Sequence, residues 1–507
     1  MSKSHYEIRC PIHGLIQMNP FERGLIDHPV FQRLRRIRQL AWTDHVYPGG
    51  MHTRFEHSIG VMHVATLLYD AILRNSTDVL LRLYGDAEEQ TWRDRERQKV
   101  RLAALLHDVG HAPFSHASEG LFPVKGSDGI GSEKLLFEEM EQKKNRYKHE
   151  DYSVALITLE MRDAIENDDF NKRNFGIKAS EIADLLEGNP DAGPTLFWKE
   201  ILSNQLDADR MDYLLRDSHH LGVNYGKYDL HRLASNVCAF EFSTDSNEIR
   251  VGIGVLKGGI HAAESLIAAR YSMFKQVYFH KTRMAFDIHL QNVMAELLEG
   301  KLFPLPNQTG LREYLKWDDW RVQGMLTDGK GGEHAQRMFQ RHQFRMIYSS
   351  RDRLVKPKDP KKGLDSIIQE EKKLKAVKKS LGGLLAAERT SKNSWYKTEA
   401  GEDITVIDEN NPSKVQPLSF YSAMAELNAE NQHFLYVAPE SVAKARPLVQ
   451  QAIDQFEEQL KQKKAKGKNS KYRQKRKSVS REVKPGLMQR PETTVPEVTE
   501  KEKRNAG

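Results

Sequence analysis

The chain has 507 residues, of which 39% are hydrophobic and 29% charged, and a formal net charge of +7. This length suits one large or two moderate globular domains, and no apolar stretch approaches the length of a membrane-spanning helix. Only two cysteines occur, which excludes a disulfide framework and favours a reducing compartment. These features predict a cytoplasmic protein without a membrane partner, or a nuclear one if the host cell has a nucleus.

Most segments between residues 11 and 300 have the apolar spacing of amphipathic helices. In chain order, the expected helices cover residues 58–73, 100–106, 181–186, 207–221 and 260–285. Strand-like runs are few and lie at residues 248–255, 343–348, 405–407 and 433–437. The pattern predicts a mainly α fold, with a helical core over residues 1–300 and a smaller mixed α/β C-terminal lobe over residues 301–457.

The C-terminal end of the chain is strongly basic. Lysine and arginine dominate from Lys461 to Arg481, and the stretch from Pro485 to Gly507 is polar and contains proline. Such a segment buries too little apolar surface to offset the entropy of ordering it, so a disordered basic tail is expected over residues 458–507. The tail could bind nucleic acid through its phosphates, or it could simply keep the protein soluble.

An apolar, helix-prone run ends abruptly in the adjacent pair His107 and Asp108. Imidazole nitrogen and carboxylate oxygen together are ligands for a divalent transition metal, and the nearby His111 and His116 could carry protons. The alternative is a plain helix C-terminus, with His107 interacting with the helix dipole and Asp108 in a solvated turn. The pair alone does not decide between the two.

Two further residues extend this pair to a ligand set. His57 directly precedes the expected helix at 58–73, and Asp209 lies near the start of the helix at 207–221. Two imidazoles and two carboxylates suit Fe, Mn, Ni or Zn, and Mg less well. The four positions are far apart in the chain, so only the fold can bring them together.

The helix that follows Asp209 carries a polar stripe. Asp209, Tyr213 and Asp217 are spaced at i, i+4 and i+8, so they share one face and span about 12 Å. That length is close to the distance from the phosphates to the sugar of a nucleoside triphosphate. The stripe indicates a wet cleft or a solvated helix face.

A second stripe has aromatic side chains between two cations, at Arg270, Phe274, Tyr278 and Lys281. Such an arrangement can bind a phosphate and pack beside a base. The alternative is core aromatics with the cations extended towards solvent.

Longer motifs carry a family resemblance. They are Pro11-Ile12-His13-Gly14, Phe31-Gln32-Arg33-Leu34-Arg35, Arg54-Phe55-Glu56-His57-Ser58, the stretch from His107 to His116, and Asp209-Arg210-Met211-Asp212-Tyr213. Together they resemble the HD-domain deoxynucleoside triphosphate triphosphohydrolases, over about residues 8–290. No SAM domain is expected, because the resemblance begins within the first ten residues or so.

The resemblance implies roles for individual residues. The metal ligands would be His57, His107, Asp108 and Asp209. The catalytic group would be His111, His116, Glu119 and His149. Residues that bind the substrate would be Gln39, Leu40, Arg54, Arg210, Tyr213, Asp217, Arg270 and Tyr278. Among these, Gln39 and Asp217 would hold the sugar 3′-hydroxyl, and Tyr278 would crowd the 2′ position. The family has Asp in place of Glu119 and Lys in place of Arg210.

The implied reaction is metal-dependent hydrolysis of a deoxynucleoside triphosphate to deoxynucleoside and tripolyphosphate. It would use one divalent transition metal, with Mg²⁺ as a further expectation on the triphosphate. The resemblance also implies a homo-oligomer, as a dimer or tetramer, and activation by GTP or a deoxynucleoside triphosphate. Asp27, Gln32 and Arg35 match the activating site, whereas Tyr6 and the pair Arg9-Cys10 depart from it.

Two other functions remain open on the sequence. One is an HD-type nuclease or phosphodiesterase that acts on single-stranded nucleic acid, which the basic C-terminal segments favour. The other is a non-catalytic protein that binds nucleic acid or supports assembly. A complete set of metal ligands argues against the second, since buried carboxylates and imidazoles without a cation are destabilising.

Overall fold

The structure is a computed structural model that describes residues 5–126, 145–243, 248–350, 360–391, 396, 403–424 and 432–479. The chain divides into two compact units, residues 1–449 and 450–507. No helix among these described ranges is both long and apolar enough to cross a lipid bilayer.

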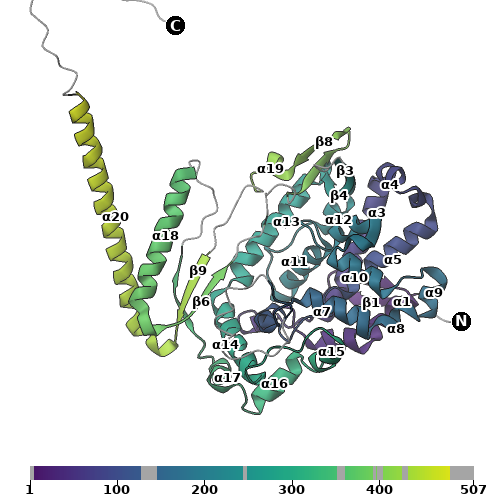
Figure 1. Cartoon of the computed structure of the whole chain (residues 1–507), viewed down its shortest axis with the longest axis horizontal. Helices are drawn as coiled ribbons and strands as arrows, with labels where there is room; N and C mark the ends of the chain where they lie inside the picture. Colours follow the sequence, from purple (N-terminus) through teal and green to yellow (C-terminus); the bar gives the residue numbers. More distant parts are fainter. Residues whose placement is uncertain are drawn as a thin grey trace, which may run out of the picture. The chain divides into compact units, whose positions relative to one another are not determined.

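Helices make up most of the described chain (Figure 1). In the first half they are α1 (Pro20–Asp27), α2 (Pro29–Gln32), α3 (Arg54–Asn75), α4 (Thr77–Leu83), α5 (Gln90–Leu106), α7 (His149–Ala155), α8 (Arg162–Glu166), α9 (Asp169–Asn174), α10 (Ala179–Glu187), α11 (Ala208–Leu221) and α12 (Leu230–Ser235). In the second half they are α13 (Ile260–Met273), α14 (Lys281–Leu297), α15 (Gln308–Tyr314), α16 (Asp319–Thr327), α17 (Gly332–Phe339), α18 (Pro360–Leu381), α19 (Leu418–Tyr421) and α20 (Val442–Val479).

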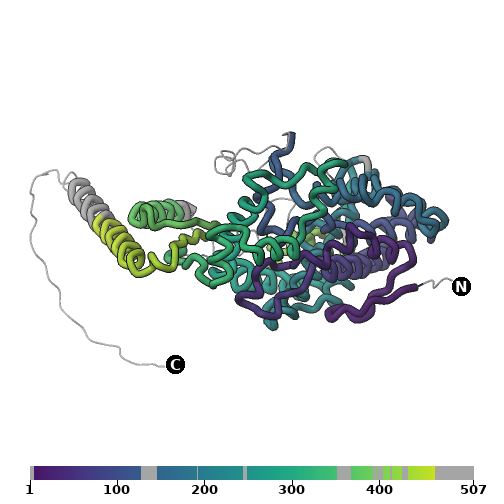
Figure 2. Tube along the Cα trace, turned by 90° about the horizontal axis from the view of Figure 1, so that it is seen from below, coloured from purple at the N-terminus to yellow at the C-terminus, as the bar shows by residue number. Residues whose placement is uncertain are grey.

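Three small sheets accompany these helices. The strands are β1 (Tyr6–Cys10), β2 (Gly14–Met18), β3 (Val237–Ser243), β4 (Ile249–Leu256), β5 (Arg345–Ser349), β6 (Leu385–Ser391), β7 (Thr405–Asp408), β8 (Asn411–Pro417) and β9 (Gln432–Val437). β1 and β2 form an antiparallel hairpin, drawn in purple in Figure 2. The second sheet has the order β3-β4-β7-β8, with β4 and β7 parallel, and the third has the order β5-β9-β6.

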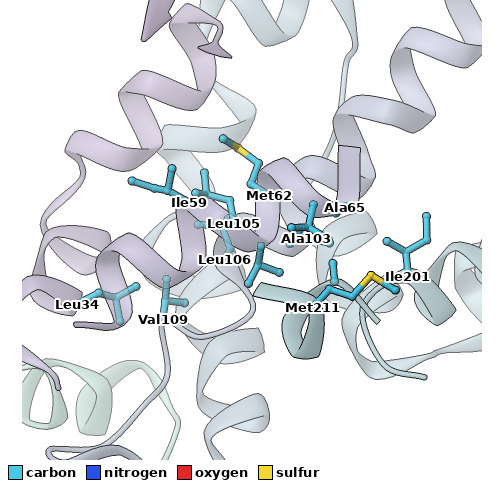
Figure 3. Close-up of a cluster of buried hydrophobic side chains, with 14 of the residues drawn as sticks. Leu34, Ile59, Met62, Ala65, Ala103, Leu105, Leu106, Val109, Ile201 and Met211 are labelled. Atoms are coloured by element: carbon cyan, nitrogen blue, oxygen red, sulfur yellow. The ribbon is translucent and has the colours of Figure 1, made fainter. Parts of the chain in front are cut away.

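The core of the first unit is built where α5 and α11 both pack on α3. Ile59 and Met62 of α3, Leu105 of α5 and Met211 of α11 are all at most 2% exposed and lie in one apolar cluster (Figure 3). Full burial of such a side chain contributes about 1.5–3 kcal/mol. The same three helices carry or adjoin the predicted metal ligands, so the best-packed part of the protein positions the site.

Local sequence explains why α3 begins where it does. Thr53 precedes the helix, and its backbone N–H donates to the Glu56 carboxylate at 3.2 Å. This capping arrangement satisfies one of the backbone groups at the helix start. It places Arg54 at the first helical position and His57 one turn into the helix.

The mainly α fold predicted from the sequence is confirmed, and all four strand-like runs contain strands. One expected helix is divided, because residues 260–285 form α13, a π-helical turn at Phe274–Tyr278, and the start of α14. His280 caps α14 by accepting from the backbone N–H of Thr282. Helix α20 continues to Val479, within the segment for which the sequence predicts a disordered tail, and residues 480–507 lie outside the described ranges.

Candidate metal centre and active site

Four side chains from three parts of the chain meet at one point. Nε2 of His57 lies 3.0 Å from Oδ1 of Asp209 and 3.6 Å from Oδ2 of Asp108. Nε2 of His107 lies 3.2 Å from Oδ1 of Asp108 and 3.8 Å from Oδ1 of Asp209. The structure therefore brings together all the metal ligands predicted from the sequence, from α3, the end of α5 and the start of α11.

Each histidine of this cluster has its second ring nitrogen fixed. Nδ1 of His57 lies 2.8 Å from the Asp212 carboxylate, and Nδ1 of His107 lies 2.7 Å from the carbonyl oxygen of Ala104. Both acceptors select the tautomer with a proton on Nδ1, which directs Nε2 into the cluster. For His107, the contact with the last turn of the helix is also the contact that orients the ligand. Asp108 is only 2% exposed, so the alternative of a solvated turn is wrong for that residue.

The sequence analysis did not identify Asp212 as a functional residue, although it lies in the motif from Asp209 to Tyr213. It is fully buried, receives two hydrogen bonds of 2.8 Å from the Arg216 guanidinium, and lies 2.6 Å from Nε2 of His13. A Cβ atom at Gly60 would come within 2.0 Å of this carboxylate, so α3 and α11 require glycine there. The spacing of Asp212 and Arg216 at i, i+4 on a mostly buried helix was the available signal.

The electrostatics of the cluster fit a divalent cation. Among the described residues, no group forms a hydrogen bond with Nε2 of His57 or of His107, and both atoms are buried. Burial lowers the pKa of His57, but Asp209 and Asp212 outweigh it and raise the value to about 9. Although partial burial acts in the opposite direction, the imidazoles hold the pKa of Asp209 far below its usual range. Two imidazoles and two ionised carboxylates form an N/O donor set that suits a transition metal, which would replace the protons they otherwise hold.

The predicted catalytic residues form a second cluster beside the first. Glu119 is central, because its Oε1 lies 2.8 Å from Nδ1 of His116 and 2.6 Å from Nδ1 of His149. The ring of His111 stacks on that of His149 with centroids 3.8 Å apart, and its Nε2 lies 3.2 Å from Oδ1 of Asp108. The glutamate thus reaches both histidines, although the resembled family has the shorter aspartate there.

These groups differ in charge. Burial lowers the pKa of His149, but Glu119 more than offsets this and raises it to about 9, so His149 is protonated at neutral pH. Burial, Arg54 and His149 all lower the pKa of His111 well below its usual value, so His111 is neutral. A protonated and a neutral imidazole in contact can serve proton donation and acceptance respectively.

The loop that carries this cluster is conformationally strained. Phe114 and Ser115 both have left-handed backbone conformations, with φ of 57° and 56°. Each such residue costs about 1–2 kcal/mol relative to a right-handed one. The strain lies between His111 and His116, at the turn that brings these histidines back towards each other.

A cavity of about 610 Å³ opens beside the metal cluster and the catalytic cluster. The residues predicted from the sequence that line this cavity are Arg54, His107, Asp108, His111, His116, His149, Asp209 and Arg210. Three lysines that were not foreseen also line it, Lys125, Lys148 and Lys199. They lie on separate elements, so spacing along the chain offered no signal for them. Together with Arg54 and Arg210 they give the cavity five cations that can bind phosphate oxygens. Carboxylates line it as well, and Lys125 lies 2.6 Å from Asp151 and Arg54 lies 2.6 Å from Asp108.

The residues predicted to hold the sugar and base form a group outside this cavity lining. Asp217 accepts a hydrogen bond of 2.6 Å from the Tyr278 hydroxyl, and its other oxygen lies 2.7 Å from Nε2 of His52. The backbone N–H of Gln39 donates to the carbonyl of His52 at 3.0 Å, which places Gln39 and Leu40 near the same group. The structure therefore brings the predicted sugar residues together, two helical turns along α11 from Asp209.

The remaining predicted phosphate ligands lie near the start of α11. Arg210 donates to the carbonyl of Asn204 and lies 3.4 Å from Asp207, whereas Arg270 on α13 contacts Gln205 at 3.5 Å. The ring of Tyr213 lies 6.1 Å from that of Tyr278. Of these residues only Arg210 lines the large cavity.

Of the residues matched to an activating site, Gln32 and Arg35 contact each other. Arg35 donates to Gln32 at 2.9 Å, and its guanidinium lies 3.5 Å above the ring centre of Phe55. Arg35 also lines a second cavity of about 350 Å³ together with Arg9, Cys10 and Glu56. Asp27 pairs with Arg23 on α1 and is not part of that lining.

The fold and this centre define an HD domain. Residues 54–217 match the family model of the HD domain, and residues 247–376 match the HD associated region. All four side chains of the metal cluster lie inside the first match. The chain therefore contains an HD domain, the domain of a class of metal-dependent phosphohydrolases, followed by the HD associated region.

Individual relatives extend this comparison. The chain is 36% identical over 296 residues to an uncharacterized protein of Methanocaldococcus jannaschii, covering 58% of this chain and 51% of that protein. It is 32% identical over 299 residues to the deoxynucleoside triphosphate triphosphohydrolase of Homo sapiens, covering 55% of this chain and 42% of that protein. The chain thus spans about half the length of the curated relatives it matches.

A solved structure matches over a larger share of the chain. The crystal structure of a hypothetical protein from Aquifex aeolicus has a TM-score of 0.65 and 25% sequence identity, covering 88% of this chain and 100% of that chain. The similarity in fold therefore extends beyond the HD domain itself.

Proposed function

We propose that the protein hydrolyses deoxynucleoside triphosphates to deoxynucleoside and tripolyphosphate. One observation carries the proposal, namely that three of the four metal ligands, the three catalytic histidines and five cationic side chains line one cavity of about 610 Å³. A triphosphate needs such cations, and the cavity is large enough for a small-molecule ligand. The similarity to the deoxynucleoside triphosphate triphosphohydrolase of Homo sapiens supports this substrate class.

His57, His107, Asp108 and Asp209 would hold one divalent transition metal, which supplies Lewis-acid stabilisation of charge at phosphorus. Arg54, Arg210 and the cavity lysines would bind the phosphates through charge-assisted hydrogen bonds. His149, protonated at neutral pH, or the exposed His116 would donate a proton to the leaving 5′-oxygen. Asp217 and Tyr278 would bind the sugar.

Product analysis tests the proposal directly. The purified protein, loaded with Mn²⁺ or Fe²⁺, is incubated with each deoxynucleoside triphosphate, and the products are separated by ion-exchange chromatography. Tripolyphosphate and deoxynucleoside in equal amounts are expected. Orthophosphate or pyrophosphate would contradict the proposed reaction. Cleavage of a labelled single-stranded oligonucleotide in a parallel sample, without triphosphate hydrolysis, would favour the nuclease.

Nucleotide activation is a second part of the proposal. Arg9 and Arg35 place two cations at the cavity of about 350 Å³, which supports binding of an anionic ligand there. Activity with one pure deoxynucleoside triphosphate, compared with a mixture that contains GTP, tests this part. Size-exclusion chromatography under the same two conditions tests whether the nucleotide drives a dimer or tetramer. Equal rates and equal elution would contradict it.

A further inference from the structure

The junction of α15 and α16, residues 314–319, contacts the loop of residues 110–116 that carries His111 and His116 and is called the catalytic loop below. The junction lies about 200 residues further along the chain. The Tyr314 hydroxyl donates to the carbonyl of Gly110 at 2.7 Å. Arg33 donates to the carbonyl of Trp317 at 2.7 Å and 3.0 Å, and Arg36 lies 2.5 Å from Asp318. The junction belongs to the HD associated region.

Asp319 makes the closest connection between this junction and the site. Its Oδ1 accepts from the backbone N–H of Phe114 at 2.7 Å, and its Oδ2 accepts from the backbone N–H of Arg38 at 2.8 Å. The residue is only 1% exposed. One buried carboxylate therefore holds two backbone segments. One of these segments contains the strained residue Phe114, which lies between His111 and His116.

A hydroxyl extends the same connection towards the phosphate ligands. Ser115 donates to the carbonyl of Arg38 at 2.8 Å and accepts from Nε of Arg54 at 3.0 Å. The backbone of Arg38 also pairs with Thr53, which precedes α3. Asp319 thus joins the catalytic loop to the start of the helix that carries Arg54 and the metal ligand His57.

We infer that Asp319 is a positioning residue for the reaction: by accepting from Phe114 and Arg38 it fixes the catalytic loop against the metal centre. The expected fall in kcat rests on the proposed function, whereas the role of Asp319 in holding the loop in place does not. Burial raises the pKa of Asp319 to about 7, although the two N–H donors and the nearby arginines act in the opposite direction. A neutral asparagine would avoid that cost of burial, but its amide could accept only one of the two N–H groups.

Asp319→Asn tests the inference, with Asp318→Asn as the matched control. Asp318 is the adjacent carboxylate, pairs with Arg36 and caps α16 by accepting from the backbone N–H of Arg321, but it accepts no bond from the catalytic loop. A loop displaced by about 1 Å costs on the order of 100-fold in rate. We therefore expect kcat of Asp319→Asn to fall about 10–100-fold while KM and bound metal change less than threefold. Asp318→Asn should retain kcat within threefold.

Hydrogen exchange measured by mass spectrometry provides a readout that needs no substrate. Faster exchange in peptides covering residues 110–122, with unchanged exchange in residues 54–75, is expected for Asp319→Asn only. Equal kcat in the two variants, unchanged exchange in the loop, or loss of the metal from Asp319→Asn would overturn the inference. If Asp319→Asn does not fold, Asp319→Ser is measured by the same criteria. A wild-type protein that releases no tripolyphosphate would refute the proposed function alone, and the exchange measurement would still decide the role of Asp319.

Discussion

The metal cluster and the catalytic cluster face one cavity but are held in different ways. The metal ligands lie on or next to α3, α5 and α11, of which α5 and α11 both pack on α3, and their imidazoles are oriented by a buried carboxylate and a helix carbonyl. His111 lies on a loop, and His149 begins α7. His116 and Glu119 lie on the 3-10 helix Ser115–Leu121, which begins at two left-handed residues, and Glu119 joins His116 to His149. Helix packing sets the first arrangement, whereas the second depends on individual hydrogen bonds.

The difference matters because the two clusters have different tasks. Metal ligands must hold one geometry, and packed helices resist displacement. Proton donors must hold suitable charges, which neighbouring groups set more readily than packing does. Four experiments separate these two forms of support.

Asp108→Ala removes a ligand from the metal cluster and should abolish both metal binding and turnover. The remaining imidazoles and Asp209 would lack one of the carboxylates that complete the donor set. Metal analysis and the tripolyphosphate assay measure the two effects. Asp70→Ala is the control, since Asp70 forms a surface pair with Arg97 and should keep both properties. Turnover that survives in Asp108→Ala would remove this residue from the centre.

Asp212→Asn tests the support behind the metal ligands. The amide cannot accept from His57 while also receiving both Arg216 bonds and contacting His13, so His57 loses its fixed orientation. Loss of such a partner typically weakens metal affinity about 10–100-fold. Competition with a chelator measures the change. Asp229→Asn, at the cap of α12, is the control with unchanged affinity expected. Equal affinity in Asp212→Asn would show that helix packing alone orients His57.

Gly110→Ala tests the fit of the catalytic loop against α7. An added Cβ would lie 2.2 Å from the carbonyl oxygen of His149 and 2.3 Å from the backbone N of Ser153. Backbone atoms cannot move aside cheaply, so we expect a loss of about 1–3 kcal/mol in the free energy of unfolding. Urea denaturation measures it. Gly120→Ala is the control, because its nearest neighbour would be 3.9 Å away. A stability loss of equal size in both variants would count against the close approach.

Glu119→Gln tests whether one carboxylate sets the charge of His149. Its raised pKa of about 9 means that His149 carries a proton below that pH and loses it as the pH rises through that value. Without the carboxylate, the pKa should fall towards the ordinary value of about 6.5. The alkaline limb of the kcat–pH profile should therefore move to lower pH. Glu119→Asp, which keeps the charge, should restore part of the shift, and identical limbs in all three proteins would contradict this role.

Much of this protein follows from local sequence. Apolar spacing predicts α3 and α11, the run before His107 predicts the end of α5, and the strand-like runs predict β4 and β9. The ligand set was also predictable, since His57, His107, Asp108 and Asp209 have metal-binding side chains and lie in motifs of a known family. Each of these signals is carried by a few adjacent residues or by one helical period.

Only the tertiary structure decided what surrounds those residues. Asp212 orients His57, Lys199 lines the cavity, and Asp319 reaches the catalytic loop from a part of the chain about 200 residues away. Their roles depend on distances between helices and loops that are far apart in the sequence. Helical or strand periodicity along the chain does not specify such distances. Local sequence determined which side chains can perform the chemistry, and packing between distant helices determined which groups hold them in place, because hydrogen bonds and burial depend on proximity in space.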